Sequence, residues 1–144
     1  MTRVVLGGRS VVPGTVEGPL LYATEPLSFW GGYDPETGHI IDRRHPLTGR
    51  NAAGCVLAIP ATRGSSTTTA VLLESVRNRT APAAIITEGP DAFVALASFV
   101  AAEMYERSIP IVALDPRDYR ALAVAERVRV LENGCLEMLG VRSA

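Results

Sequence analysis

The alternation of apolar and polar positions changes at about residue 53. Before this point the chain carries short apolar runs, RVVL, SVV, GPLLYA and GHIID, which Gly and Pro residues interrupt. Such spacing is typical of short strands and turns rather than of helices. From Ala53 onward, short apolar runs alternate with longer segments of helical periodicity, which predicts alternating strands and helices.

Three apolar runs in the second part of the chain predict buried strands. They are GCVLAIP at 54–60, APAAIIT at 81–87 and IPIVALD at 109–115. Short runs without a polar face are expected of strands that are covered on both faces of a sheet. Because helices join these strands, we expect them to pair in parallel, with right-handed crossovers.

Two helices are predicted between these strands. The first spans about 66–79 and places Leu72, Leu73 and Val76 on one side. The second precedes the last strand and has Pro90 in its first turn, where proline is favoured. Its i, i+3, i+4 spacing predicts an apolar face that is formed by Phe93, Leu96, Ala97, Val100, Ala101 and Met104.

A hairpin closes the pattern, because Asn133-Gly134 separates the apolar runs of VRVLENGCLEML. Asn-Gly is a strong short-range signal for a hairpin turn. We therefore expect one α/β domain over residues 1–144, a length that suits a single domain. Its parts are a β-rich N-terminal layer, a parallel βαβαβ unit and the closing hairpin.

Composition favours a folded protein that binds neither nucleic acid nor a membrane. Hydrophobic residues make up 47% of the chain and charged residues 20%, far from the composition of a disordered chain. The formal net charge of -1 provides no overall positive field for polyanions or anionic lipids. No apolar run approaches the ~20 residues of a membrane span, and Cys55 and Cys135 do not form a close pair, so we expect a cytoplasmic protein.

All 14 basic residues are arginines, and the chain has no lysine. It therefore cannot provide the amine for a Schiff base, and imine catalysis by this polypeptide is excluded. Arginine instead offers a planar fork of N–H donors. Cationic contacts of this chain would suit a carboxylate or a phosphate.

The stretch PATRGSSTTTAV, residues 60–71, places five consecutive hydroxyl side chains between the first buried strand and the first helix. Open α/β sheets usually bind their ligands at this edge. Gly64 allows the backbone to turn sharply or to lie close to a bound group, and Ser65 and Ser66 precede helical N–H groups that favour an anion. A helix N-cap followed by threonines in the first turn is the alternative, and it stays open. The stretch is neither a P-loop nor a nucleophile elbow.

Ser65 needs help to act as a base. A helix N-terminus stabilises a negative charge by at most about 2 kcal/mol, which corresponds to roughly 1.5 pK units. This is too little to ionise a serine hydroxyl at neutral pH. Arg63, buried N–H donors or groups from another chain would have to supply the remainder.

His39, Asp42 and His45 recur at three-residue intervals, which invites comparison with a metal site. The segment has the pattern of a strand followed by a Pro turn, so hydrogen bonds that fix a loop are the favoured interpretation. An iron–sulfur cluster takes three or four cysteine ligands, and this chain has two. A cluster would therefore have to be held by another polypeptide.

Phe29 and Trp30 form an aromatic pair next to Gly31-Gly32. Aromatic residues are frequent in protein cores and are enriched in subunit interfaces. The pair suits a core position and a subunit contact equally well, and both alternatives stay open.

The segment from Phe29 to Asp115 resembles the small subunit, or swivel domain, of the aconitase X family. Its most specific part is the pattern GG-x-D-x-x-TG-x-IID-x-x-H-P-x-x-G. The GSS element at 64–66 is also similar to the swivel loop of the aconitases proper. The pattern is formed by Gly31, Gly32, Asp34, Thr37, Gly38, Ile40, Ile41, Asp42, His45, Pro46 and Gly49.

This resemblance implies a swivelling β/β/α domain and a hydro-lyase that is built from two subunits. A large subunit would carry most of the substrate site and an iron or iron–sulfur centre, with no metal bound by this chain. The small subunit would bring Ser65 over the substrate as the base. Family activities are the dehydration of cis-3-hydroxy-L-proline in bacteria and of phosphomevalonate in archaea.

Arg63 and the backbone donors of Gly64 and Ser66 are the predicted substrate-binding groups, because they could stabilise charge on a substrate carboxylate. Asp42 and His45 are predicted to border the shared site. In the aconitases proper an arginine follows the serines, whereas threonines follow them here, so carboxylate recognition falls to Arg63 or to the partner.

We therefore predict a dehydratase small subunit that is inactive alone and that pairs with an aconitase X large subunit. Its predicted substrate is a small hydroxy acid, cis-3-hydroxy-L-proline, and the product is Δ1-pyrroline-2-carboxylate. One alternative is the small subunit of phosphomevalonate dehydratase. The other is a mobile module that binds an anion without catalysis.

Overall fold

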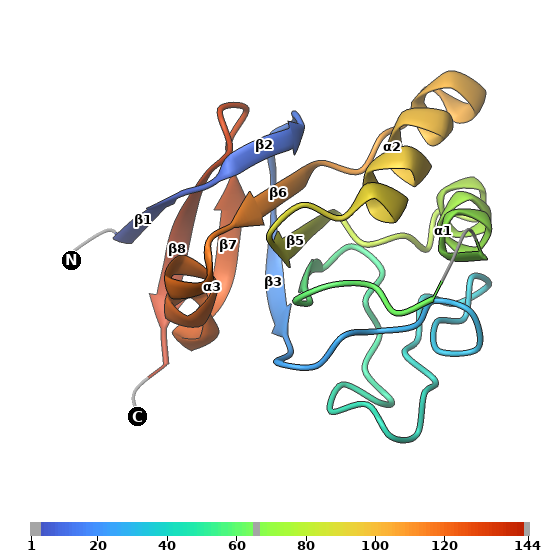
Figure 1. The fold of residues 1–144 in the computed structure, drawn as a ribbon, viewed down its shortest axis with the longest axis horizontal. Helices are drawn as coiled ribbons and strands as arrows, with labels where there is room; N and C mark the ends of the chain where they lie inside the picture. Colours follow the sequence, from blue (N-terminus) through green and yellow to red (C-terminus); the bar gives the residue numbers. More distant parts are fainter. Residues whose placement is uncertain (1–3, 65–66, 143–144) are drawn as a thin grey trace.

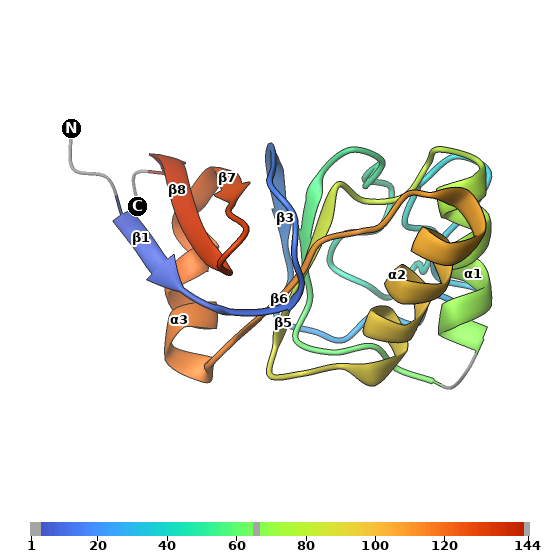
Figure 2. The same ribbon diagram turned by 90° about the horizontal axis from the view of Figure 1, so that it is seen from above.

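Two layers of β-strands and one layer of helices are stacked in the computed structural model, which describes residues 4–64 and 67–142 (Figure 1, Figure 2). The strands are β1 Val4–Gly7, β2 Arg9–Val12, β3 Val16–Tyr22, β4 Val56–Ala58, β5 Ala84–Glu88, β6 Ile111–Leu114, β7 Ala125–Val130 and β8 Cys135–Val141. The helices are α1 Thr67–Arg77, α2 Ala92–Tyr105 and α3 Pro116–Ala121, and α3 continues into a 3-10 turn, η1 Leu122–Val124.

The central layer is a parallel unit. Strands β4, β5 and β6 lie side by side in parallel, with Val56 opposite Ala84 and Ile85 opposite Ile111. Helices α1 and α2 connect them and cover the outer face of this layer (Figure 2). The predicted βαβαβ unit, with strands at 54–60, 81–87 and 109–115, is thus confirmed.

The second layer is antiparallel and contains the predicted hairpin. Strands β7 and β8 pair antiparallel, and the Gly134 N–H donates to the Leu131 carbonyl at 2.9 Å in the turn between them. β3 joins the layers, because its first half pairs with β7 and its second half pairs in parallel with β4. The strand order is β1-β8-β7-β3-β4-β5-β6-β2.

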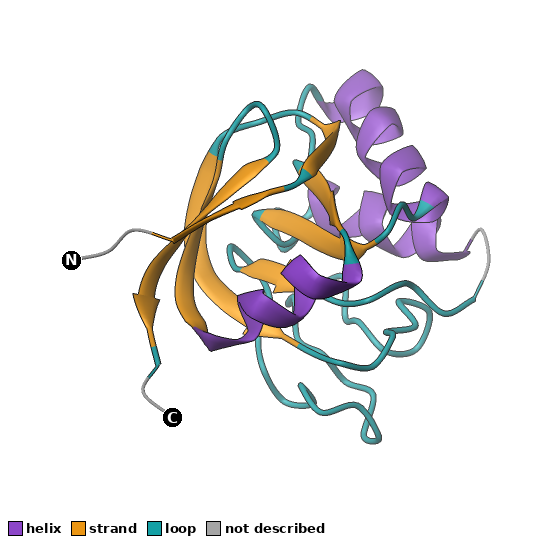
Figure 3. Cartoon of the chain, turned by 60° about the vertical axis from the view of Figure 1, so that its left-hand side comes forward, coloured by secondary structure: helices purple, strands orange, loops and turns teal. Residues whose placement is uncertain are grey.

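The N-terminal strands are shared between the layers. β1 pairs with β8 at one end of the strand order, and β2 pairs with β6 at the other. Gly8 lies between them, and a Cβ atom there would clash with Val112 and would lie 2.7 Å from the Gly134 carbonyl oxygen. The α/β fold class and the β/β/α layering are confirmed (Figure 3). The N-terminal strands do not form a layer of their own, because β1 and β2 lie at the two ends of the strand order and β3 lies in its middle.

Alternate residues of the central strands serve two cores, as the period of a strand requires. Toward the antiparallel layer they contribute Val56, Ala58, Ala84, Ile86, Val112 and Leu114. Toward the helices they contribute Leu57, Ile59, Ile85 and Ile111. Both sets are buried, which explains why these strands read as continuous apolar runs.

Helix α1 agrees with its prediction over the described residues. Leu72 and Val76 are buried, and Leu73 is partly buried against the same core. Thr68 and Ser75 are also buried on this side.

Within the two described ranges, no helix combines the length and the apolar character that crossing a membrane would take.

Helix α2 differs from its prediction at both its start and its buried face. Asp91 is the N-cap and the helix begins at Ala92, so Pro90 lies before the helix and not in its first turn. The buried residues are Val94, Ala97, Ser98 and Ala101, and the predicted face was wrong for Phe93, Leu96 and Met104, which are exposed. Small side chains allow a helix backbone to lie close to its neighbours, and here that close contact determines the buried face.

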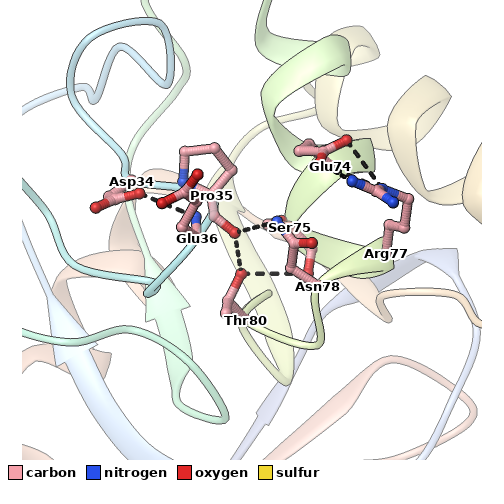
Figure 4. Close-up of polar contacts among 8 residues, drawn as sticks. All are labelled: Asp34, Pro35, Glu36, Glu74, Ser75, Arg77, Asn78 and Thr80. Carbon is pink, nitrogen blue, oxygen red and sulfur yellow. Dashed lines mark hydrogen bonds and ion pairs between the residues drawn. The ribbon is translucent and has the colours of Figure 1, made fainter.

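The segment 23–53 is an irregular chain that lies against the end of α1 (Figure 4). The Pro35 carbonyl accepts hydrogen bonds from Asn78 Nδ2 at 3.0 Å and from Thr80 Oγ1 at 2.6 Å. The Tyr33 hydroxyl donates to the Thr80 carbonyl at 2.7 Å. Phe29 is fully buried in this region, whereas the neighbouring Trp30 is 68% exposed, so the two members of the aromatic pair have different environments.

Candidate functional site

The loop that carries Arg63 and Gly64 leaves the carboxyl end of β4. Two further ladder bonds extend the pairing beyond the strand: Ile59 N–H donates to the Ile86 carbonyl at 3.0 Å, and Glu88 N–H donates to the Pro60 carbonyl at 3.1 Å. The chain then turns toward α1, which begins at Thr67. This is the edge of a parallel sheet at which ligands usually bind.

Backbone pairing with Leu27 fixes one side of this loop. The Leu27 N–H donates to the Ala61 carbonyl at 3.3 Å, and the Arg63 N–H donates to the Leu27 carbonyl at 3.0 Å. Leu27 itself is fully buried. The loop backbone is therefore held in place up to the residue before Gly64.

Asp91 fixes the other side. Its Oδ2 accepts hydrogen bonds from the Thr62 backbone N–H at 2.8 Å and from Thr62 Oγ1 at 2.7 Å. Its Oδ1 accepts from the N–H groups of Phe93 and Val94 at the start of α2. One carboxylate thus caps α2 and ties the β4–α1 loop to it.

Gly64 is required by its backbone conformation. Its φ is +118°, in the region that side chains of L-residues rarely adopt. Among the described residues a Cβ atom would meet only Ser28 Oγ, at 3.9 Å, so they leave space for a side chain. The prediction of a sharp turn at Gly64 is confirmed.

The structure describes only part of the run of hydroxyl residues at 65–69. Ser65, the predicted base, and Ser66, a predicted substrate-binding residue, lie outside the described ranges. Thr68 is buried against the core, and Thr69 Oγ1 donates to the Phe93 carbonyl of α2 at 3.4 Å. Thr68 and Thr69 therefore serve the packing of the first turn of α1, as the N-cap alternative expects for this part of the run.

Arg63 is exposed at the rim of the loop. No carboxylate among residues 4–64 and 67–142 forms an ion pair with its guanidinium. A guanidinium of this kind keeps its N–H donors available for an anion. Arg63 is thus the cationic group that the described part of the loop offers to a ligand.

Asp42 and His45 form hydrogen bonds that hold the irregular segment, as the loop interpretation of the His39, Asp42 and His45 spacing predicted. Asp42 Oδ1 accepts from the Arg44 N–H at 2.9 Å. His45 is buried, and its Nδ1 accepts from the Leu47 N–H at 3.1 Å. Its Nε2 therefore carries the proton, which it donates to the Glu25 carbonyl at 3.2 Å. Glu25 is two residues from Leu27, so His45 supports the segment that pairs with the loop.

The described residues do not fit a metal centre. They contain no group of three or more His, Cys, Asp or Glu side chains that could hold a metal ion. Cys55 and Cys135 are free thiols at the starts of different strand segments. Burial raises the pKa of the Cys55 thiol, which disfavours the thiolate that a metal would need.

A cavity of about 130 Å³ is lined by residues at the end of β3. Arg50 and Arg142 contribute to its lining together with Leu47. Of the predicted site residues that the structure describes, neither Arg63 nor Gly64 lines it.

Two parts of this site were missed from the sequence. Asp91 follows Gly89-Pro90 and precedes an apolar helix, which is the pattern of an N-cap and could have been recognised. Its second role toward Thr62 had no sequence signal, since the two residues are 29 positions apart. The pairing of Leu27 with the loop could not be predicted from the sequence either, because it depends on how the irregular segment folds back.

Three stacked layers, with a loop at the carboxyl end of the central parallel strands, define a swivelling β/β/α domain. The family model that matches the chain, over residues 5–138, is the aconitase X swivel domain. The chain therefore belongs to the aconitase X swivel domain family.

Relatives of two kinds support this assignment. A cis-3-hydroxy-L-proline dehydratase of Pseudomonas aeruginosa is 48% identical over 130 residues, which cover 90% of this chain and 22% of that protein. A phosphomevalonate dehydratase small subunit of Thermococcus gammatolerans is 37% identical over 135 residues, which cover 93% of this chain and 97% of that protein. The chain thus spans about a fifth of the length of the hydroxyproline dehydratases that it matches.

A solved structure has the same fold. The crystal structure described as Thermococcus kodakaraensis aconitase X in its holo form superposes with a TM-score of 0.82. The match covers 95% of this chain and 99% of that chain at 31% identity. The layer order and the position of the loop thus belong to an architecture that solved aconitase X shares.

Proposed function

We propose that this chain is the small subunit of an aconitase X type dehydratase and acts as one swivel domain beside a large subunit. The substrate is cis-3-hydroxy-L-proline, and the product is Δ1-pyrroline-2-carboxylate. The 48% identity with the Pseudomonas aeruginosa hydroxyproline dehydratase supports this substrate. The unpaired state of the two cysteines supports a reducing compartment such as the cytoplasm.

The loop geometry is the observation that carries the proposal. Leu27 and Asp91 hold residues 61–63 at the carboxyl end of β4, and Gly64 turns the chain immediately before Ser65. Arg63 is exposed beside this turn. A fixed loop that is followed by a serine and offers a guanidinium suits a substrate with a carboxylate next to the C–H bond that loses its proton.

In the proposed reaction Ser65 takes the proton from the α-carbon of the substrate. The electron pair of that C–H bond forms a double bond to C3, and the C3 hydroxyl leaves as water with a proton taken from solvent. Ser65 returns the proton that it has accepted to solvent. The ring then tautomerises to Δ1-pyrroline-2-carboxylate. Arg63 and the backbone N–H groups of Gly64 and Ser66 bind the carboxylate, on which charge develops during proton removal.

A partner is needed because the isolated loop is open to water. Arg63 and Gly64 are exposed, and a helix N-terminus alone contributes only about 2 kcal/mol toward an anionic serine. A large subunit that closes over the loop would exclude water and strengthen each polar contact. The names of the relatives called small subunits support such a partner, which would also hold the iron or iron–sulfur centre.

Phosphomevalonate dehydration is the second candidate. The match covers 97% of the Thermococcus gammatolerans small subunit, whereas it covers only 22% of the Pseudomonas aeruginosa enzyme. The same proton removal and loss of water would apply, with additional cationic groups for the phosphate supplied by the partner. Asp42 and His45 would border the site in both cases, through the segment that pairs with the loop.

An assay of the reconstituted enzyme tests the proposal. The chain, the large subunit and their mixture are each incubated with cis-3-hydroxy-L-proline and, separately, with phosphomevalonate. We expect product only from the mixture and only with hydroxyproline. If the mixture forms product from phosphomevalonate and none from hydroxyproline, phosphomevalonate dehydration is the function. An inactive but stable mixture that binds either substrate would favour a non-catalytic anion-binding module.

A further inference from the structure

Helix α2 carries an apolar surface on its outer side. Phe93 is 37% exposed, Leu96 51%, Phe99 53% and Met104 59%. With 3.6 residues per turn, Leu96 and Phe99 lie opposite the side that faces the core, and Phe93 and Met104 lie on the flank next to them. We call this surface the α2 apolar face.

The distribution of sizes on α2 is the reverse of that expected for a helix at a protein surface. The inner side buries Val94, Ala97, Ser98 and Ala101, which are smaller than the exposed residues. Scattered exposed apolar residues are normal, but large ones gathered on one surface mark an interaction site. The arrangement indicates that α2 packs on both sides when the protein is in its working assembly.

A lipid surface does not suit the α2 apolar face. Helices that lie in a membrane interface carry Lys or Arg on the polar side. Between Ala92 and Tyr105 the one charged residue is Glu103, and the side opposite the apolar face is packed into the protein. The chain as a whole has a net charge of -1 and no lysine.

The α2 apolar face begins at the candidate site. Asp91 links the start of α2 to Thr62, and Thr69 donates to the Phe93 carbonyl. On another side of the loop, Ser28 Oγ would lie 3.9 Å from a Cβ atom if residue 64 had one. Ser28 Oγ also donates a hydrogen bond to the carbonyl of Trp30, which is exposed. A polypeptide that closes over Arg63 and Gly64 would thus meet apolar surface at both of these places.

Such a polypeptide is available in the same enzyme family. The match covers 22% of the Pseudomonas aeruginosa hydroxyproline dehydratase, so most of that enzyme lies outside it. The Thermococcus gammatolerans protein is matched over 97% of its length and is called a small subunit, a name that implies a further chain. We propose that the α2 apolar face and Trp30 form the docking surface for the large subunit, an inference that rests on the proposed function.

Association of the two subunits tests this inference. The double variant Leu96→Glu/Phe99→Glu introduces charge into the α2 apolar face, and Leu96→Ala/Phe99→Ala removes only apolar area. The matched control is Val5→Glu, at a position 51% exposed on β1, at the far end of the molecule from α2 (Figure 1). The Kd for the large subunit is measured by isothermal titration calorimetry, and the thermal unfolding of each isolated variant is recorded.

We expect the Glu pair to weaken association at least ~30-fold and the Ala pair at least ~5-fold, since buried apolar anchors dominate interface energies. The control should bind like the wild type, and all variants should unfold at the wild-type temperature within a few degrees. Unchanged association of both pairs, with an active complex, would overturn the docking surface and leave the proposed function standing.

Two other outcomes would also overturn the inference. If the isolated wild-type chain forms a dimer that the Glu pair dissociates, while binding to the large subunit is unaffected, the occupant is a second copy. If the wild-type chain binds vesicles of phosphatidylcholine with phosphatidylserine and the Glu pair does not, the occupant is a lipid surface. If the wild-type chain does not bind the large subunit at all, the proposed function fails as well.

Discussion

The two crossover helices α1 and α2 belong to the same parallel unit and pack against each other, yet they distribute their side chains in opposite ways. Helix α1 buries Val71, Leu72 and Val76 and presents Glu74 and Arg77 to solvent. Helix α2 buries residues that are mostly small and presents large apolar side chains. The pattern of α1 is that of a helix whose large apolar side chains pack within this chain. Helix α2 does not have this pattern, because its large apolar side chains are exposed.

This difference teaches that apolar periodicity identifies a helix but does not identify its buried face when apolar residues occur all round. On α1, polar residues mark the outside, and the prediction for Leu72 and Val76 was correct. On α2, Glu103 is the one charged residue, so side-chain size and close packing decide which side faces the core. Exposed apolar residues on such a helix are then evidence about a partner.

The largest expected effect separates the leucines of the two helices. Leu72→Ala should reduce the free energy of unfolding by about 2–5 kcal/mol, because Leu72 is fully buried and a cavity would remain. Leu96→Ala should change it by less than ~0.5 kcal/mol, because Leu96 is 51% exposed. Urea unfolding of the isolated chain measures both. Equal losses at the two positions would remove the distinction between the helices.

A smaller effect separates their buried serines. The Ser98 hydroxyl donates to the Ile109 carbonyl at 2.6 Å and accepts from the Ile109 N–H at 2.8 Å, whereas Ser75 donates to Leu72 of its own helix at 2.7 Å. Ser98→Ala should cost about 1–3 kcal/mol, because it leaves two buried backbone groups without this partner. Ser75→Ala should cost less than ~1 kcal/mol, because the Leu72 carbonyl keeps its helical hydrogen bond.

The same urea unfolding experiments report the serine pair. Ser98→Thr serves as a control for Ser98, since it retains the hydroxyl and adds one methyl group. A Ser98→Ala loss no larger than that of Ser75→Ala would contradict the anchoring of α2 through Ile109.

The smallest effect concerns the outer side of α1. A hydrogen bond from Arg77, aided by its charge, holds the pKa of Glu74 below the ordinary value of 4.5 (Figure 4). A carboxylate with a lowered pKa stabilises the fold above its ordinary pKa, and this contribution is lost as the pH falls through the lowered value. Thermal unfolding of wild type and Glu74→Gln between pH 3 and 7, roughly the range over which carboxylates titrate, should therefore differ slightly at pH 7 and converge in acid. A difference that grows in acid would contradict the assignment.

Much of the fold could be predicted from the sequence because the central strands have covered faces and clear turn residues. The runs at 54–60, 81–87 and 109–115 contain few polar residues, and Asn133-Gly134 marks the hairpin. The pairing of β1 with β8, of β2 with β6 and of β3 with two neighbours could not be predicted. These contacts are long-range, and a short strand carries no signal for its partner. Helix α3 was also missed, although Asp115 before Pro116 is an N-cap pattern.

The candidate site was predictable where its residues are adjacent in sequence. Arg63 and Gly64 lie in the loop where the alternation of strands and helices placed them, and Gly64 has the backbone conformation that a sharp turn requires. The roles of Leu27, Asp91 and His45 in holding that loop depend on tertiary contacts. Thr68 and Thr69 lie in the first turn of α1, and this position in the helix alone explains their contacts.

The central claim is that Ser65 is the base and that the large subunit makes it reactive. The most direct measurement is kcat/KM of the reconstituted enzyme for cis-3-hydroxy-L-proline with Ser65→Ala, beside Thr69→Val as a hydroxyl control in the same run. We predict a loss of roughly 10²–10⁴-fold for Ser65→Ala with unchanged subunit affinity, and near wild-type rates for Thr69→Val. Full activity of the Ser65→Ala enzyme would contradict the claim.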